Sequence, residues 1–168
     1  LNLFLKQDDS VLFVCGYSFS DEHINERIMS ALQTNTTAHV FVLNYDIECS
    51  KDNNGDIVKT YNFNADTNLG KLASQNRKIS VLATKTAIIG GQYGEWKIRQ
   101  DINQNDVLNP ESYYEEEITY KTNIENGEQT SRKVRTGKGE LLLPNFVSFV
   151  NLLKSMIPKN EWEGNECE

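Results

Sequence analysis

Three short runs of consecutive apolar residues stand out in the first half of the chain: 11–15 (VLFVC), 40–44 (VFVLN) and 79–83 (ISVLA). Each run is continuous rather than alternating, which is typical of strands buried on both faces of a parallel sheet. The segments between them, about 21–34 and about 66–76, have apolar residues at helical spacing. The order strand, helix, strand, helix, strand predicts a right-handed, doubly wound α/β sheet.

Polar residues mark the ends of these elements. Ser20 or Asp21 can cap the first helix, and Asp66 is the expected cap of the second, since short polar side chains accept hydrogen bonds from the first free amides. Asn54-Gly55, between the second and third apolar runs, is a strong turn dipeptide.

The pattern changes after residue 84. Residues 85–96 (KTAIIGGQYGEW) carry three glycines and are predicted to form a loop or short turn, and residues 101–112 are polar and predicted to be loop. Two β-prone stretches, about 113–123 and 129–135, flank Asn126-Gly127, which predicts a β-hairpin.

The two ends of the chain have helical character. Residues 146–157 carry an apolar stripe at helical period, and Pro158 is expected to stop that helix. The opening LNLFLKQ has the apolar spacing of the last turn of a helix and no capping residue. We therefore expect the chain to begin in the middle of a fold.

Charge argues against one class of partner. The net charge is −7 and the pI is near 4.9, whereas nonspecific nucleic-acid binding needs clustered cations facing the phosphates. A basic cluster does occur, formed by Arg132, Lys133, Arg135 and Lys138. It lies near Glu115–Glu117 in the predicted hairpin, so we expect mutual neutralisation and no direct contact with nucleic acid.

The cysteines bear on the compartment and on metal binding. Cys15, Cys49 and Cys167 are odd in number and widely spaced, which favours reduced thiols and a cytoplasmic protein. No CxxC pair occurs, so we expect no structural zinc and no other metal. No apolar run approaches the roughly 20 residues that span a bilayer, so no membrane association is expected.

The first candidate site follows the first predicted strand. In parallel α/β sheets, ligands bind beyond the carboxyl ends of the strands. Gly16 lies at such an end and lets a ligand approach the backbone, and Tyr17 and Ser18 follow it with hydroxyl groups. Asp21 and Glu22 would repel a phosphate, which favours ribose hydroxyls as the nearest ligand groups. An ordinary strand-to-helix turn explains the same pattern.

The second candidate site follows the second predicted strand. Asn44 ends that strand, and Tyr45 and Asp46 come directly after it. An amide or carboxylate at this place can hold ribose hydroxyls, as the acidic residue of dinucleotide folds does. Asn and Asp also begin turns of no functional significance. Two such strand ends in succession favour a shared crevice.

Other motifs give weaker signals. The glycines within Gly90–Gly94 are not followed by the Lys-Ser/Thr of a phosphate-binding loop. His23 and His39 have no Cys or Ser partner at suggestive spacing, and we expect both on the solvated surface. No residue of this chain is predicted to be catalytic.

The stretch CGYSFSDEHINERI, followed by VFVLNYD, resembles the C-terminal half of a sirtuin-like (silent information regulator family) domain of the bacterial antiphage-defence type. Protein deacetylases of the family carry Gly-Thr-Ser where this chain has Gly16-Tyr17-Ser18, and Ile-Asn where it has Leu43-Asn44. The later IIGGQYGEW and GKGELLLPNFVSFVNLLKS also resemble C-terminal segments of that branch. The resemblance implies the C-terminal part of a Rossmann-like, doubly wound parallel sheet.

The resemblance also implies a function. Defence-type sirtuins cleave the nicotinamide–ribose bond of NAD+, so the expected parent protein is an NAD+ glycohydrolase with NAD+ as substrate. The family's first glycine-rich loop and its catalytic Asn and His have no counterpart here and are expected upstream. Residues 1–100 would then supply the ribose- and phosphate-binding wall through Gly16, Tyr17, Ser18, Asn44, Tyr45 and Asp46. Residues 101–168 would form a hairpin and helix packed on that domain, and this chain alone would be inactive.

Two alternatives remain at this stage. The chain could be a module that senses NAD or ADP-ribose without turnover. It could instead be an assembly element, with its hairpin and last helix docking a partner. Within the family, homo-oligomers are common and some members assemble with a HerA-like hexameric ATPase, so both partners are implied by the resemblance.

Overall fold

The computed structural model describes residues 2–97, 113–125 and 128–157. The chain separates into two compact units, Leu1–Trp96 (unit 1) and Lys97–Glu168 (unit 2). The elements of unit 1, in chain order, are α1 (Asn2–Leu5), β1 (Val11–Cys15), α2 (Glu22–Thr34), β2 (His39–Asn44), β3 (Ile47–Lys51), β4 (Ile57–Tyr61), α3 (Asn68–Gln75), β5 (Ile79–Ala83), β6 (Thr86–Ile89) and β7 (Gln92–Glu95). Unit 2 contains β8 (Tyr114–Glu125), β9 (Glu128–Leu141) and α4 (Phe146–Ser155).

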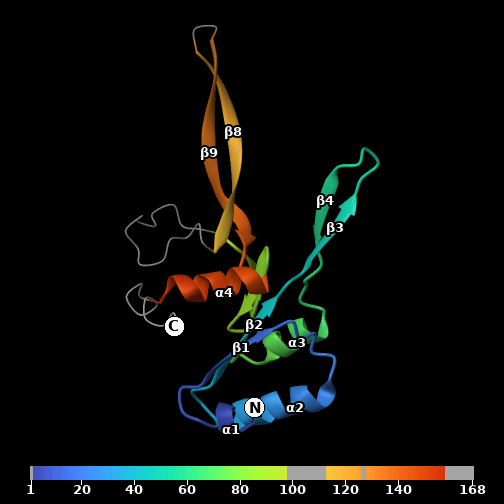
Figure 1. Ribbon diagram of the computed structural model, residues 1–168, viewed down its shortest axis with the longest axis vertical. Helices are drawn as coiled ribbons and strands as arrows, with labels where there is room; N and C mark the ends of the chain where they lie inside the picture. The colour runs from blue at the N-terminus through green and yellow to red at the C-terminus, as the bar shows by residue number, and fades with distance from the viewer. Residues whose placement is uncertain (1, 98–112, 126–127, 158–168) are drawn as a thin grey trace, which may run out of the picture. The chain divides into compact units, whose positions relative to one another are not determined.

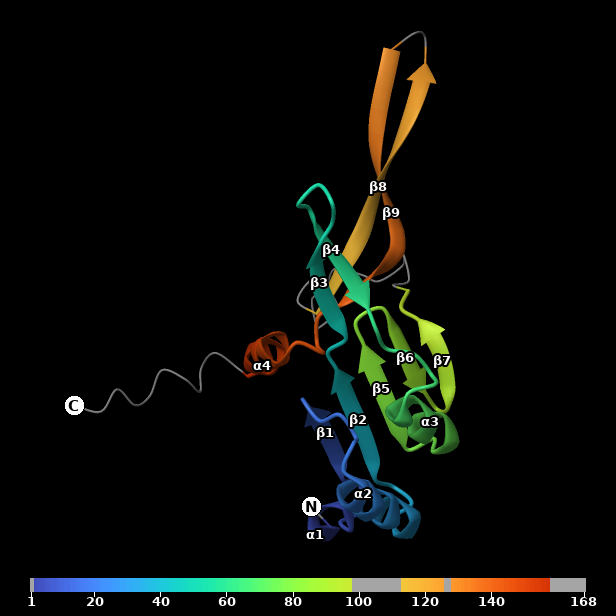
Figure 2. The same ribbon diagram turned by 90° about the vertical axis from the view of Figure 1, so that its right-hand side faces the viewer.

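A five-stranded mixed sheet, in the order β1-β2-β5-β6-β7, organises unit 1 (Figures 1 and 2). The three apolar runs form β1, β2 and β5, and they pair in parallel as predicted. The expected burial on both faces was wrong for β1, because it is the edge strand, and its Val11 and Phe13 side chains are exposed. The two helices predicted between them are also present, as α2 and α3. The fold is therefore mixed α/β.

The prediction of a loop for residues 85–96 was wrong. This segment forms β6 and β7, an antiparallel hairpin that extends the sheet beyond β5. Gly90 and Gly91, at φ +59° and +84°, form its two-residue turn, in a backbone region that side chains disfavour. The glycines that indicated a loop are thus the turn of a hairpin, and they make the sheet mixed instead of purely parallel.

The core of unit 1 lies between the sheet and helices α2 and α3. Val40 and Val42 of β2 pair with Ile79 and Val81 of β5 and share one face of the sheet. These side chains form a single buried cluster with apolar residues of both helices: Ile28, Ala31, Leu32, Leu69 and Ala73. Both helices therefore cover the same face, and a doubly wound arrangement, which has helices on both faces, is not established by unit 1.

The helices begin where capping residues allow them to. Asp21 caps α2 and accepts hydrogen bonds from the amides of His23 and Ile24, as predicted. The cap of α3 is Thr67, one residue after the predicted Asp66, because its hydroxyl reaches the Gly70 amide at 3.0 Å.

A second hairpin in unit 1, β3–β4, was not predicted from sequence. The turn at Asn54-Gly55 is confirmed: Gly55 has φ +87°, and the Asp52 carboxylate accepts the amides of Asn54 and Asp56. The flanking strands are mostly exposed and carry no continuous apolar run, so the pattern that located β1, β2 and β5 was missing.

Unit 2 consists of the long β8–β9 hairpin and α4. The hairpin and the last helix are both confirmed, but β9 extends past residue 135 to Leu141, and a bulge between Glu116 and Ile118 shifts its register. Asn145 caps α4. The predicted loop at 101–112, the turn at Asn126-Gly127 and the stop at Pro158 lie outside the described residues.

Candidate functional site

The ends of three neighbouring parallel strands define one edge of the sheet in unit 1. Cys15 pairs with Leu43, and Asn44 pairs with Ala83. Gly16, Asn44 and Thr84 therefore follow one another across the carboxyl ends of β1, β2 and β5. We call these three neighbouring strand ends the carboxyl edge; Figure 2 shows the strands side by side. This is the side on which α/β sheets bind ligands.

Gly16 combines a special backbone with open space. Its φ of +68° lies in the left-handed region, which glycine adopts without the steric cost that a side chain brings. A Cβ placed on Gly16 would meet no heavy atom within 4 Å. The turn needs glycine for its conformation, and the same position leaves the backbone open to an approaching molecule.

Tyr17 and Ser18 have partners within their own loop. The Tyr17 hydroxyl lies 2.9 Å from the Asn25 Oδ1 and donates to it or to the Asp21 carbonyl at 3.0 Å, so it fastens the loop to α2. The Ser18 hydroxyl pairs with that of Ser20 on the exposed side. Because Asp21 already accepts the first free amides of α2, the helix N-terminus is occupied by the chain's own carboxylate.

The three candidate residues at and after the end of β2, namely Asn44, Tyr45 and Asp46, differ in how far they are buried. Asp46 is buried, and its carboxylate accepts the amides of Thr84 at 3.0 Å and Phe63 at 3.4 Å. It thus braces the carboxyl edge from within. Tyr45 is 55% exposed, and Asn44 is half-buried with no side-chain hydrogen bond among the described residues. Asn44 and Tyr45 therefore remain available to a ligand.

Two residues of the carboxyl edge were missed in the sequence. Thr84 is 2% exposed, and its hydroxyl and that of Thr86 are buried with no hydrogen-bond partner in the described part of the chain. Unpaired buried hydroxyls are uncommon because each costs free energy. Thr84-Lys85-Thr86 directly follows the buried run 79–83, so the rule applied to the first two strand ends would have found them.

Aromatic residues border the same edge. The Trp96 indole donates to the Ala83 carbonyl at 2.8 Å, and its backbone amide donates to Lys85, so the end of β7 folds over the end of β5. The Lys85 ammonium lies 4.8 Å from the centre of the Tyr61 ring, a cation–π distance. Among the described residues, the side chains at and beside the carboxyl edge thus include the Asn44 amide, hydroxyl groups, aromatic rings and the Lys85 ammonium.

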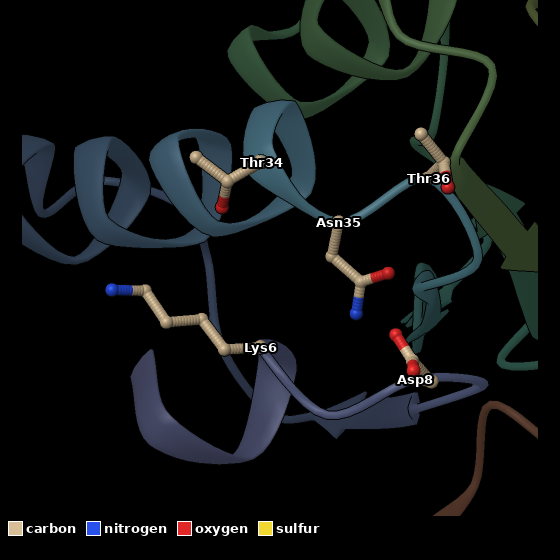
Figure 3. A pocket seen from close by; sticks show the side chains of 5 residues that line it. All are labelled: Lys6, Asp8, Thr34, Asn35 and Thr36. Carbon is tan, nitrogen blue, oxygen red and sulfur yellow. The ribbon is translucent and has the colours of Figure 1, made fainter.

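A hollow of about 350 Å³ lies at the opposite, amino edge of the sheet, lined by Lys6, Asp8, Thr34, Asn35 and Thr36 (Figure 3). Figure 3 shows the Asn35 side chain extending from the end of α2 toward the segment that carries Asp8. Asn35 donates to the carbonyls of Leu5 and Gln7, and its oxygen accepts the amides of Thr37 and Ala38. Its hydrogen-bonding capacity is used inside the protein, so we assign it a structural role.

The two histidines have different environments. His23 is exposed, as expected. His39, expected on the solvated surface, is half-buried on the sheet face opposite Val40 and Val42, and its Nε2 lies 2.9 Å from the Ser80 hydroxyl. Burial lowers the pKa of His39 below its usual value. Because Ser80 is 1% exposed, a substrate does not reach this serine–histidine pair, and its role is packing.

Comparison of the chain with protein-family models and with curated proteins found no match. Within the described ranges, no three His, Cys, Asp or Glu side chains come together in a group that could hold a metal ion. Among the described helices, none combines the length and the apolar character needed to cross a membrane.

Proposed function

We propose that unit 1 forms one wall of an NAD+ site in a sirtuin-like NAD+ hydrolase, and that its sheet is the C-terminal part of a Rossmann-like, doubly wound sheet. The observation that carries the proposal is the adjacency of Gly16 and Asn44 at the carboxyl ends of β1 and β2. The resemblance of GYSFSDEHIN and VFVLNYD to the defence-type branch selects NAD+ among nucleotides.

The groups at this edge suit the ribose. Asn44 can donate and accept hydrogen bonds through its amide, and the exposed Ser18 hydroxyl can do the same with sugar hydroxyls. Open space beside Gly16 admits the sugar close to the backbone. Asp21 and Glu22 make the first turn of α2 acidic, which favours ribose over phosphate at that point.

In this proposal Tyr17 and Asp46 support the wall and do not touch the ligand. Tyr17 holds the loop to α2, and Asp46 holds the end of β5 against the end of β2. Gly16, Ser18, Asn44 and Tyr45 then provide the contacts. Bond cleavage would use residues outside this chain, while the wall keeps the ribose in place for them.

A second candidate function is an NAD- or ADP-ribose-sensing module without turnover. It is favoured by the chemistry of Asn44 and Ser18, whose amide and hydroxyl groups stay neutral near pH 7 and bind without transferring protons. Both candidates require the same binding edge, and they differ in whether the complete protein releases nicotinamide.

Asn44→Ala tests the binding edge. We expect at least about tenfold weaker ADP-ribose binding to the chain, and a similar loss of NAD+ cleavage in the complete protein, since hydrogen bonds to the ribose are removed. Gln33→Ala makes the same kind of change at an exposed position near the amino edge and should leave both unchanged. Unaltered binding by Asn44→Ala, with Gln33→Ala equally unaltered, would contradict the proposed site.

Thr84→Val tests whether the buried Thr84 hydroxyl has a structural partner. Valine has nearly the shape of threonine, and it removes a buried hydroxyl that lacks a partner among the described residues. The variant should therefore be at least as stable as the wild type in urea unfolding. A less stable variant would show that the Thr84 hydroxyl is bonded within the protein.

A further inference from the structure

Residues 16–21 connect β1 to α2 (Figure 1), and we call them the β1–α2 loop. Their side chains alternate in burial. Ser18 and Ser20 are exposed. Phe19 is 2% exposed, and the half-buried Tyr17 ring lies 4.7 Å from its ring. The loop is therefore anchored on its inner side by two aromatic rings, and it presents two hydroxyl groups on its outer side.

Phe19 has an unusual backbone conformation for a large residue. Its φ of +55° lies in the left-handed region, where a side chain brings a steric cost. Its ring belongs to the hydrophobic core of unit 1, so the buried ring is combined with a disfavoured backbone. Such strain persists where the surrounding structure holds the residue in place, and it is frequent in loops that clamp ligands. The β1–α2 loop therefore needs an interaction that holds it.

The side chain of Asn25, in α2, provides this interaction. Its Nδ2 donates to the Phe19 carbonyl at 3.0 Å, and its Oδ1 lies 2.9 Å from the Tyr17 hydroxyl. Its backbone amide donates to the Asp21 carbonyl at 3.1 Å, which closes the first turn of α2. One half-buried side chain thus links both inner residues of the loop to the helix.

Capping of the helix does not explain the position of this side chain. Asp21 caps α2 by accepting the amides of His23 and Ile24, so the helix begins without help from the Asn25 amide group. Asparagine is also a weak helix former in the interior of a helix. Asn25 therefore contributes to the loop and not to the helix.

The outer side of the loop keeps hydrogen-bonding capacity for a ligand. The Ser18 and Ser20 hydroxyls are hydrogen-bonded to each other. Whichever hydroxyl donates this bond, the other keeps a proton that the bond does not use, and both oxygens have lone pairs. Because both side chains are exposed, the pair can donate to one sugar hydroxyl and accept from another.

We propose that Asn25 is the positioning residue of the ribose site, and that it holds the β1–α2 loop so that the Ser18–Ser20 hydroxyl pair faces the ligand. This inference rests on the proposed function. Asn25 does not touch the ligand. Its bonds fix Tyr17 and Phe19, and because inner and outer residues alternate, they also fix the direction of the two serines. A loop that is held before binding costs the ligand less ordering.

Two substitutions test this role. Asn25→Ala removes both side-chain bonds to the loop, and alanine is the better helix former, so α2 itself is not weakened. Tyr17→Phe removes only the hydroxyl and leaves the ring against Phe19. Asn151→Ala is the matched control, because Asn151 is an exposed asparagine within the helix α4.

Chymotrypsin digestion of the full chain reports on the loop without a ligand, since this protease cleaves after aromatic residues such as Tyr17 and Phe19. We expect Asn25→Ala to be cleaved at these two positions about tenfold faster than the wild type, because the loop opens more often. Cleavage after Phe41, in the inner strand β2, requires unfolding of the sheet and should rise far less. Fragment masses identify each position, and Asn151→Ala should match the wild type.

Calorimetric titration with ADP-ribose provides the readout that a merely structural role would not change. Asn25→Ala should raise the dissociation constant of the folded chain about tenfold, and Tyr17→Phe should raise it by less. The double variant should show less than the product of the two single effects, because both residues act through one hydrogen bond. Asn151→Ala should bind as the wild type does.

Three results would overturn the proposal. Equal cleavage of Asn25→Ala and Asn151→Ala in the loop would show that Asn25 does not hold it, whether or not the NAD+ site is correct. Faster cleavage of Asn25→Ala with the wild-type dissociation constant would show that the held loop does not position the ligand. A wild type that binds no ADP-ribose would overturn the proposed function together with this role, so wild-type binding distinguishes the two failures.

Discussion

Asp46 is the buried carboxylate that joins the ends of three segments of unit 1. It lies two residues after the end of β2, and its carboxylate accepts the amides of Thr84, after β5, and Phe63, after β4. Asp46→Ala removes both acceptors and leaves two buried amide groups without partners. We expect this substitution to destabilise the carboxyl edge more than any change of an exposed acidic residue.

The expected loss in the free energy of unfolding of Asp46→Ala follows from the two hydrogen bonds that it removes. A bond from a buried amide to a charged group contributes about 1.5–3 kcal/mol. The bond from Thr84, at 3.0 Å, has ordinary geometry, whereas the bond from Phe63, at 3.4 Å, is long and counts for less. The sum is a loss of about 2–4 kcal/mol, a large part of the roughly 5–15 kcal/mol that stabilise a typical domain.

Urea unfolding in a Trp162→Phe background provides the assay, because Trp96 is then the sole tryptophan and reports on the carboxyl edge through its bond to Ala83. Asp56→Ala is the matched control, since Asp56 is exposed and its hydrogen bonds with Asp52 use its backbone amide and carbonyl. A free energy of unfolding for Asp46→Ala within about 0.5 kcal/mol of the control would refute the bracing role.

Two further predictions concern stability. Gly70→Ala should cost about 1–3 kcal/mol because its Cβ would lie 2.6 Å from the Ala65 carbonyl oxygen, whereas Gly94→Ala meets nothing within 4 Å; equal melting temperatures would contradict this. Burial lowers the pKa of His39 below about 6.5, so the unfolded chain binds the proton first and stability falls as pH drops below that value. His39→Gln should lose less stability than the wild type between pH 7 and about pH 5.5 in urea titrations, and an identical loss would count against the assignment.

The parallel part of the sheet was readable from the sequence because its strands coincide with continuous apolar runs. These runs, 11–15, 40–44 and 79–83, match β1, β2 and β5, which pair in parallel, although β1 is a partly exposed edge strand. Strands without such a run were not predicted. β3 and β4 are mostly exposed, and neither contains a run of consecutive apolar residues like those of β1, β2 and β5. Their turn at Asn54-Gly55 was found because turn chemistry is local.

Glycine carried an ambiguous signal. Gly90 and Gly91 were interpreted as loop residues, yet they form a hairpin turn with strands of four residues on each side. Such short strands give too few positions for an alternating pattern to be distinguished from a loop. The mixed character of the sheet follows from this hairpin and could not be deduced from the apolar runs alone.

Sequence reasoning identified the candidate edge but not the task of each residue in it. Strand ends alone placed Gly16 and Asn44 near each other. The internal bonds of Tyr17 and Asp46 depend on Asn25, Thr84 and Phe63, which come from other parts of the chain and are not visible as a local pattern. Thr84 was within reach of the same rule, because it follows a buried strand.

The central claim is that the carboxyl edge of unit 1 binds the ribose of NAD+. Amide chemical-shift mapping of the chain, titrated with ADP-ribose, tests it most directly. The account predicts the largest shifts at Gly16, Ser18 and Asn44, with the residues of the amino-edge hollow, such as Lys6 and Asn35, unchanged. Shifts confined to the amino edge, or none at saturating ligand, would contradict it.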